Sequence, residues 1–340
     1  MSFTKIAVIG CGHWGPNHIR VFSHLPESRV VSVADLDAKR LEAIGAQYPD
    51  AQRFSDYRAL LRESPAEAVV VASPAKSHFE IVKDALLANK HVLCEKPLCV
   101  KSQEAQQLVA LAEKQNRILM TGHVFLFNPG ILKLKELVSA GESGRIYYLR
   151  ATRTNFGPIR SDVNSVLDLA THDISIFNFL LGARPLSASA VGGGYLQPNV
   201  EDVACICLRY PGDVLAYIHV SWLDPKKVRE IRVVGEKRML VWDELAALGP
   251  IYVYDNAVVR NRWDYQDYAQ YQLLAREGGI TIPKVQLEEP LRAQNRHFLK
   301  CVRENRGGSP DGDFAIDVVR VAEAIAKSME AGGAPAQVEG

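Results

Sequence analysis

The chain has 340 residues, and a prior of about 150 residues per domain divides it into about two domains. Its 40 Lys and Arg residues against 39 Asp and Glu residues give a formal net charge of +1, so it lacks the excess positive charge that attracts nucleic acid or an anionic membrane. No charged leader precedes the first apolar segment and no apolar run approaches the ~20 residues of a membrane span, so we expect a cytoplasmic protein.

The first expected strand, residues 4–9, leads into a glycine-rich turn and then a helical segment. This places G-x-G-x-x-G in the strand–turn–helix context that binds a dinucleotide. Gly10 permits the tight turn, Gly12 lets a pyrophosphate approach the backbone, and Gly15 lets the helix pack closely on the strand. The expected cofactor contacts in this turn are Gly10, Gly12, His13, Trp14 and Gly15.

A second expected strand, residues 29–34, ends at Asp35, twenty residues past Gly15. A carboxylate at this spacing accepts a hydrogen bond from the 2′-hydroxyl of a ribose and repels a 2′-phosphate, so NAD is favoured over NADP. The alternative is that Asp35 caps the next helix. Lys39 and Arg40 lie close by in sequence, which leaves the strictness of this preference open.

Strands and helices continue to alternate up to residue 121, which predicts a parallel, doubly wound sheet in a Rossmann domain over residues 1–121. Ser73 and His78 follow the expected strand 67–72 and are candidate cofactor contacts. His78 is a minor one, because a lone histidine at a helix start is more often a cap or a surface residue. The further expected segments are helices 38–46, 56–63, 76–88 and 102–116 and strands near 53, before Lys96 (with the apolar run 92–94) and at 117–121.

The stretch from His91 to Leu98 places an ammonium group at the end of an apolar strand. Pro97 removes a backbone donor and favours an extended Lys96, so the strand should stop there. Ligands bind at the carboxyl ends of strands in an open α/β sheet, which makes Lys96 a candidate for chemistry. Alternatively, Lys96 is an ordinary loop charge.

The second half, residues 122–340, has a different pattern. A helix is expected at 129–139, followed by strands at 145–154, 186–196, 203–210, 213–222, 228–234 and 238–242. Short turns between consecutive strands predict an α+β domain with a large, mostly antiparallel sheet, covered on one face by helices 165–181, 289–304 and 313–330. The open face would suit a homo-oligomer interface.

The cysteines of the chain are scattered without a C-x-x-C pair or clustered histidines, so we expect no metal site. Cys205 and Cys207 alternate along an expected strand and would share one face. We expect both to be small buried hydrophobes rather than metal ligands or disulfide partners.

The most informative stretch of the second half runs from Ser165 to Gly182. Asp168 and His172 are four residues apart and would lie on one face of a helix. A carboxylate beside an imidazole can orient the ring and favours imidazolium, as a general acid/base near pH 7 requires. The alternative is a capping box from Ser165 to Asp168, with His172 an ordinary buried or surface histidine.

The glycine motif, the Glu95-Lys96-Pro97 segment and Asp168 followed by His172-Asp173 together resemble the glucose-fructose oxidoreductase/inositol dehydrogenase/MocA family. The resemblance implies a Rossmann domain followed by an α/β domain with an open sheet. It also implies that Lys96 touches the reacting oxygen, that His172 is the general acid/base, that Glu95 and Lys96 contact the cofactor, and that the bond before Pro97 is cis. The chain has Ser175 where the family often has Asp, which weakens any role assigned there.

Two further segments resemble the branch that oxidises the C3 hydroxyl of UDP-N-acetylglucosamine: residues 12–20 and residues 155–164. Under this resemblance Arg153 and Arg160 bind the diphosphate, since guanidinium groups bind phosphate oxygens bidentately; otherwise they are surface arginines. Residues 256–283 hold aromatic side chains that either form an arm on a neighbouring subunit or stack on a base: Trp263, Tyr265, Tyr268 and Tyr271.

The expected activity is hydride transfer from a secondary alcohol of a UDP-linked amino sugar to NAD+. The expected catalytic residues are Lys96, Asp168 and His172. The expected substrate contacts are these three residues together with Arg153 and Arg160. Two alternatives stay open: an enzyme of the same family that oxidises a free polyol or aldose such as inositol, and a nucleotide-sensing regulator without catalysis. We expect a homodimer or homotetramer.

Overall fold

The computed structural model describes residues 3–160, 163–260, 273–306 and 312–339. The chain divides into two compact units, residues 1–127 with 288–323 and residues 128–287 with 324–340. This division differs from a single cut after residue 121, because a segment near the carboxyl end returns to the first unit.

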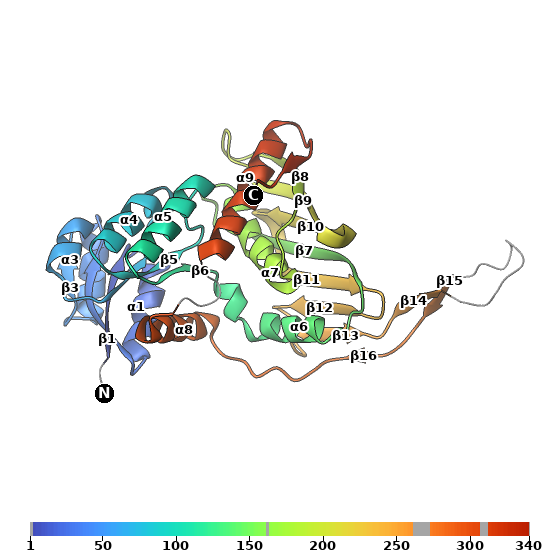
Figure 1. Ribbon diagram of the computed structural model, residues 1–340, viewed down its shortest axis with the longest axis horizontal. Coiled ribbons are helices and arrows are strands. Elements are labelled where there is room, and N and C mark those ends of the chain that lie inside the picture. Colours follow the sequence, from blue (N-terminus) through green and yellow to red (C-terminus); the bar gives the residue numbers. More distant parts are fainter. Residues whose placement is uncertain (1–2, 161–162, 261–272, 307–311, 340) are drawn as a thin grey trace, which may run out of the picture. The chain divides into compact units, whose positions relative to one another are not determined.

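The first unit is built on a six-stranded sheet in which all neighbouring strands are parallel (Figure 1). The strand order is β3-β2-β1-β4-β5-β6. The order of successive strands therefore switches from one side of β1 to the other, and doubly wound sheets bind ligands at the carboxyl ends of the strands beside such a switch point. This confirms the predicted Rossmann-like sheet. The strands are β1 (Thr4–Ile9), β2 (Ser28–Ala34), β3 (Gln52–Phe54), β4 (Ala68–Val71), β5 (His91–Glu95) and β6 (Leu119–Gly122).

Helices pack on both faces of this sheet because successive side chains of each strand point to opposite faces. Ile6 and Val8 of β1 pack with α1, α2 and α8, whereas Ala7 and Ile9 pack with α3, α4, α5 and the first part of α9. The helices are α1 (Gly15–His24), α2 (Ala38–Gln47), α3 (Tyr57–Glu63), α4 (His78–Leu87), α5 (Ser102–Lys114), α8 (Pro290–Glu304) and α9 (Gly312–Glu330), with short 3-10 turns η1 (Ala75–Ser77) and η2 (Val124–Phe127).

The second unit contains a nine-stranded sheet with the order β16-β13-β12-β11-β7-β10-β9-β8-β17. β7 and β10 are parallel and the other neighbouring pairs are antiparallel, which confirms the predicted mostly antiparallel sheet. The strands are β7 (Ile146–Phe156), β8 (Ser187–Gly193), β9 (Val203–Tyr210), β10 (Val214–Ser221), β11 (Leu223–Gly235), β12 (Met239–Asp243), β13 (Ile251–Tyr254), β16 (Ile280–Thr281) and β17 (Ala336–Gln337), beside a separate hairpin of β14 (Ala257–Arg260) and β15 (Leu273–Arg276).

The two faces of the nine-stranded sheet differ in exposure. Helix α7 (Thr171–Leu181) lies against one face, where Tyr210 Oη of β9 donates to Asn178 Oδ1 at 2.8 Å (Figure 1). Alternate residues of β9 and β10 point to the other face and are exposed, including Tyr217 at 41%. Cys205 and Cys207 share this face as predicted, but the expectation that they are buried is wrong, because they lie on the side opposite α7.

Another helix of the second unit, α6 (Pro129–Ser139), is capped by Asn128, whose Oδ1 accepts from the Gly130 amide at 2.9 Å. Over the residues that the structure describes, no helix combines the length and apolarity needed to cross a bilayer.

Candidate active site

The glycine-rich turn at the end of β1 has the geometry that a dinucleotide requires. Gly10 has a φ of +94°, and a Cβ there would lie 2.7 Å from the carbonyl carbon of Ala72. A Cβ on Gly15 would lie 1.9 Å from the carbonyl oxygen of Gly10, so neither position accepts a side chain. In the described part of the chain no side-chain hydrogen bond caps the first turn of α1. Its N–H groups therefore suit phosphate oxygens, and the turn fits the pyrophosphate of NAD.

Asp35 follows β2 and lies beside this turn. Its Oδ2 accepts from the Cys11 amide at 2.6 Å and its Oδ1 accepts from the Asp37 amide at 2.8 Å. An ionised carboxylate has about four lone-pair positions, so it can also accept from a ribose hydroxyl. The alternative role of Asp35 as a helix cap is wrong, because Asp37 caps α2 by accepting from the Lys39 amide. Arg40 Nη1 lies 3.7 Å from Asp35 Oδ2 and so brings a cation to the same place.

Ser73 and His78 lie at the carboxyl end of β4. Ser73 Oγ accepts from Ser77 Oγ at 2.8 Å. The His78 ring is 1% exposed, with Nε2 2.8 Å from the Ser73 carbonyl oxygen and Nδ1 2.8 Å from the Pro97 carbonyl oxygen. Its observed contacts are therefore to the backbone of two loops of the first unit, and a direct cofactor contact stays a prediction.

Glu95, the last residue of β5, is 7% exposed and its Oε1 lies 2.8 Å from His18 Nε2 on α1. His18 is fully buried. A Cβ on Gly122 would lie 3.1 Å from the same carboxylate oxygen, which is a tight contact. The carboxylate that precedes Lys96 is thus held by the helix that follows the glycine turn.

Lys96 is partly exposed at the carboxyl end of β5. The Lys96–Pro97 peptide bond is cis, which confirms the expectation from the family resemblance. The ammonium group also influences His123, which follows β6 and is fully buried. Burial first, and the charge of Lys96 second, lower the pKa of His123 to about 3, so this imidazole is neutral beside the lysine.

His172 lies in the second unit as the second residue of α7 and is 8% exposed. Ser175 Oγ donates to its carbonyl oxygen at 2.7 Å. The predicted helix over 165–181 is present, but it begins with a π-helical segment, Val166–Ala170. Such segments are rare and recur at functional sites. Because a π-helical turn is wider than an α-helical one, the predicted alignment of Asp168 with His172 on one face stays a prediction.

Asp168 lies inside the π-helical segment and is held from two directions. Its Oδ1 accepts from Arg160 Nη1 at 3.1 Å, and its Oδ2 accepts from Trp222 Nε1 at 3.2 Å. The alternative capping box is not observed among the described residues, because Ser165 makes no side-chain cap and Asn164 accepts a backbone N–H there instead. Arg160 is 35% exposed at its side chain, so this predicted diphosphate contact lies at the surface of the unit beside Asp168.

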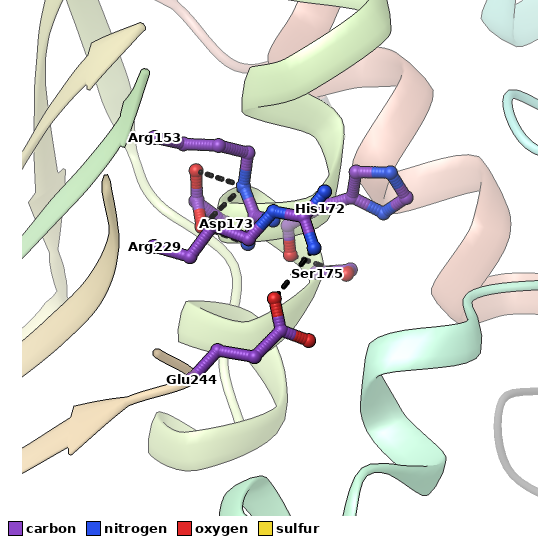
Figure 2. A network of polar contacts seen from close by, with 6 residues as sticks. All are labelled: Arg153, His172, Asp173, Ser175, Arg229 and Glu244. Carbon is purple, nitrogen blue, oxygen red and sulfur yellow. Dashed lines mark hydrogen bonds and ion pairs between the residues drawn. The ribbon is translucent and has the colours of Figure 1, made fainter. Parts of the chain in front are cut away.

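Arg153 has a different environment from a surface arginine. Its guanidinium binds Asp173 with an Nη2–Oδ1 distance of 2.7 Å and an Nε–Oδ2 distance of 3.0 Å, and both side chains are at most 2% exposed. Burial raises the pKa of Asp173, while the nearby Arg153 and Arg229 oppose that shift. Arg229 in turn binds Glu244 at 2.5 Å (Figure 2). We therefore keep Arg160 and not Arg153 as a diphosphate candidate.

The structure brings the predicted residues together within each unit. The first unit groups the glycine turn with Asp35, Ser73 and the Glu95–Pro97 segment, and the second groups Arg160 with Asp168. His172 is adjacent in sequence to the Arg153–Asp173 pair (Figure 2). The predicted aromatic residues Trp263, Tyr265, Tyr268 and Tyr271 lie outside the described residues.

Several polar partners were not anticipated from the sequence. They are His18, His123, Asp173, Trp222 and Arg229. Each of them interacts with a residue that is distant in the sequence. Only two had a local sequence feature that could have pointed to them: His18 lies one turn after the glycine motif, and Asp173 lies next to His172.

Two family models match the chain. Residues 4–123 match the oxidoreductase family with an NAD-binding Rossmann fold, and residues 131–241 match the GFO/IDH/MocA C-terminal domain.

Individual relatives point to more than one substrate. A UDP-N-acetylglucosamine 3-dehydrogenase from Acidithiobacillus ferrooxidans is 29% identical over 332 residues, covering 97% of this chain and 99% of the relative. Inositol 2-dehydrogenase 2 from Saccharopolyspora erythraea is 31% identical over 223 residues, covering 64% of this chain. The uncharacterized oxidoreductase YrbE from Bacillus subtilis is 27% identical over 63% of this chain. The matches span 66% of the length of each of the last two relatives.

Solved structures agree in fold. UDP-N-acetylglucosamine 3-dehydrogenase GnnA from A. ferrooxidans superposes with a TM-score of 0.80 at 25% identity, over 97% of this chain and 99% of that one. GenD2 from gentamicin A biosynthesis, solved with NAD, has a TM-score of 0.84 at 22% identity over 100% of this chain and 97% of that one. The chain belongs to the GFO/IDH/MocA oxidoreductase family and carries its NAD-binding Rossmann domain.

Proposed function

We propose that this oxidoreductase uses NAD+ to oxidise the C3 hydroxyl of a UDP-linked amino sugar, converting UDP-N-acetylglucosamine to its 3-oxo form. The observation that carries the proposal is the similarity to the A. ferrooxidans UDP-N-acetylglucosamine 3-dehydrogenase over 97% of this chain. Arg160 supports it, because a partly exposed guanidinium beside Asp168 suits the phosphate oxygens of a nucleotide sugar.

In the proposed reaction the alcohol loses a proton from its oxygen and a hydride from its carbon. His172 takes the proton as general base, and Asp168 contributes negative charge near the start of the same helix. Lys96 stabilises the negative charge that develops on the alcohol oxygen. Bound NAD+ would accept the hydride. The glycine turn and Asp35 would hold the pyrophosphate and the ribose.

A second candidate substrate is a free polyol or aldose. The 31% identity to an inositol 2-dehydrogenase favours it, although that match covers 64% of this chain. A polyol has no phosphate, so under this alternative Arg160 contributes only through Asp168.

The noncatalytic alternative, a nucleotide-sensing regulator, shares the cofactor site but not the chemistry. A regulator that only senses a nucleotide has no use for both the ammonium group of Lys96 and the imidazole of His172. Tight NAD+ binding without NADH formation from any sugar or polyol would select this alternative.

The deciding experiment is a side-by-side assay of NADH absorbance with UDP-N-acetylglucosamine, UDP-glucose and inositol. The proposal expects turnover of UDP-N-acetylglucosamine and the highest kcat/KM for it. Turnover of inositol without turnover of either UDP-sugar would replace the proposed substrate by a polyol.

We also propose that the chain assembles as a homodimer or homotetramer through the exposed face of the nine-stranded sheet. Tyr148 stacks on Tyr217 there, with ring centroids 5.9 Å apart, and Leu215 is 38% exposed. An apolar and aromatic sheet face of this kind suits contact with a second copy. Sedimentation of the wild type and of Tyr217→Lys tests it; a wild-type monomer at all concentrations would refute it.

A further inference from the structure

His78 joins two loops of the first unit. It is the first residue of α4 and is 1% exposed. Its Nε2 lies 2.8 Å from the carbonyl oxygen of Ser73, in the loop after β4. Its Nδ1 lies 2.8 Å from the carbonyl oxygen of Pro97, in the loop after β5. Because β4 and β5 are neighbouring parallel strands, one ring spans the carboxyl ends of both.

The two contacts above are with carbonyl oxygens, which only accept hydrogen bonds. A ring nitrogen facing a carbonyl must therefore carry a proton to bind it. A neutral imidazole can donate to one of the two carbonyls and an imidazolium to both. The two contacts are separate interactions, and each can be removed without the other.

Each carbonyl belongs to a different part of the proposed chemistry. The loop of Ser73 packs on the dinucleotide turn, because a Cβ on Gly10 would lie 2.7 Å from the Ser73 nitrogen. Pro97 directly follows Lys96. On the other side of Lys96, the carboxylate of Glu95 lies 2.8 Å from His18. The segment that carries the ammonium group is thus held by a buried histidine on each side.

We propose that His78 is a positioning residue for Lys96: the N–H of its Nδ1 donates to the Pro97 carbonyl and fixes this segment, while the Nε2 side of the ring packs against the loop of Ser73 beside the dinucleotide turn. The inference rests on the proposed role of Lys96 in the reaction. A shift of the order of 1 Å in a catalytic group can cost up to about 100-fold in rate. Loss of the Nδ1 contact should therefore lower kcat.

Two conservative variants separate the contacts. The amide nitrogen of Asn can occupy the position of Nδ1, so His78→Asn keeps the contact with Pro97. The amide nitrogen of Gln can occupy the position of Nε2, so His78→Gln keeps the contact with Ser73. We expect His78→Gln to lower kcat by about 10- to 100-fold with little change in NAD+ affinity. We expect His78→Asn to keep more of kcat.

A matched control removes a buried histidine contact elsewhere on β5. His91 Nδ1 accepts from the Ile118 amide at 3.1 Å, at the amino end of the strand and so away from Lys96. His91→Gln places its amide at the position of Nε2 and not of Nδ1, so it removes this contact and should lower thermal stability without selectively lowering kcat. Equal kcat in the wild type and both His78 variants, or equal losses in kcat in all three variants, would overturn the inference.

A readout without turnover separates this inference from the proposed function. Hydrogen exchange followed by mass spectrometry should show faster exchange of residues 96–99 in His78→Gln than in His78→Asn. If the wild type oxidises none of the tested alcohols, the proposed function fails while the exchange result still decides the role of His78. Unchanged exchange of residues 96–99 in both variants would refute the inference.

If neither variant folds, the wild type supplies the test. The nitrogen-15 spectrum of selectively labelled histidine should show a proton on Nδ1 of His78, which donates to Pro97. A ring that carries its only proton on Nε2 leaves Pro97 without this donor and would overturn the proposal.

Discussion

Asp173→Asn tests the buried ion pair next to His172. The substitution removes the negative charge and leaves the Arg153 guanidinium, which is 2% exposed, without its carboxylate. A buried charge that loses its partner is costly because water cannot replace the lost interaction. Breaking such a pair by removing one partner destabilises a protein by about 3–5 kcal/mol. This is a large part of the about 5–15 kcal/mol that separates folded from unfolded states.

The geometry supports the upper part of this range of destabilisation, since Asp173 receives three charge-assisted hydrogen bonds from Arg153 at 2.7, 3.0 and 3.2 Å. With a urea m value of about 2 kcal/mol/M, the expected loss moves the denaturation midpoint by about 2 M. Trp222 and Trp242 are at most 1% exposed in the second unit, so tryptophan fluorescence can follow this transition.

Two matched variants complete the experiment. Glu244→Gln removes the partner of Arg229 from a pair whose side chains are 32% and 25% exposed, and should cost only about 0–1 kcal/mol. Arg153→Met combined with Asp173→Asn removes the buried guanidinium as well and should recover part of the stability lost in the single Asp173 variant. If Asp173→Asn cost no more than Glu244→Gln, or if the double variant were less stable than the single one, the reasoning would be wrong.

Three further predictions concern the first unit. Burial lowers the pKa of His91 to about 4 and that of His123 to about 3, so below about pH 6.5 the unfolded chain binds more protons than the folded one. Thermal unfolding should therefore show a stability that is complete above this pH and falls toward pH 4, and His91→Asn should flatten that profile. Asp35→Asn should improve kcat/KM for NADP+ relative to NAD+ by about tenfold or more, because Arg40 then meets a 2′-phosphate without the competing carboxylate, whereas an unchanged ratio in cofactor kinetics would contradict this role. Gly15→Ala should abolish the thermal stabilisation by NAD+, because the added Cβ would lie 1.9 Å from a backbone oxygen of the glycine turn.

Local patterns predicted much of the nucleotide half. The spacing from Gly15 to Asp35 identified the carboxylate that the structure places beside the glycine turn. The strand–helix alternation predicted the parallel sheet, because parallel neighbouring strands need a crossover connection, usually a helix, between them. The period of two also placed Cys205 and Cys207 on one face, but it could not show which face helices cover, since that depends on distant segments.

The contacts that hold the candidate site could not be predicted in the same way. His18 and Glu95 are 77 residues apart, and Trp222 reaches Asp168 from 54 residues away. No local rule pairs side chains over such separations. The π-helical turn at Val166–Ala170 was also missed, because its residues are compatible with an ordinary α-helix. Arg153 was predicted to bind the diphosphate, with a surface arginine as the alternative, and its buried partner Asp173 became visible only with the tertiary fold.

The most direct test of the proposed chemistry is a double-mutant cycle on Lys96 and His172, measured as NADH formation together with NAD+ affinity. If both side chains act on one alcohol oxygen, Lys96→Ala and His172→Ala should each retain NAD+ binding and lose about 10²- to 10⁴-fold in kcat. The double variant should then lose no more than the more damaged single variant, because residues that act as a unit are not additive. Full activity in either single variant, or losses that multiply completely in the double variant, would contradict a shared role.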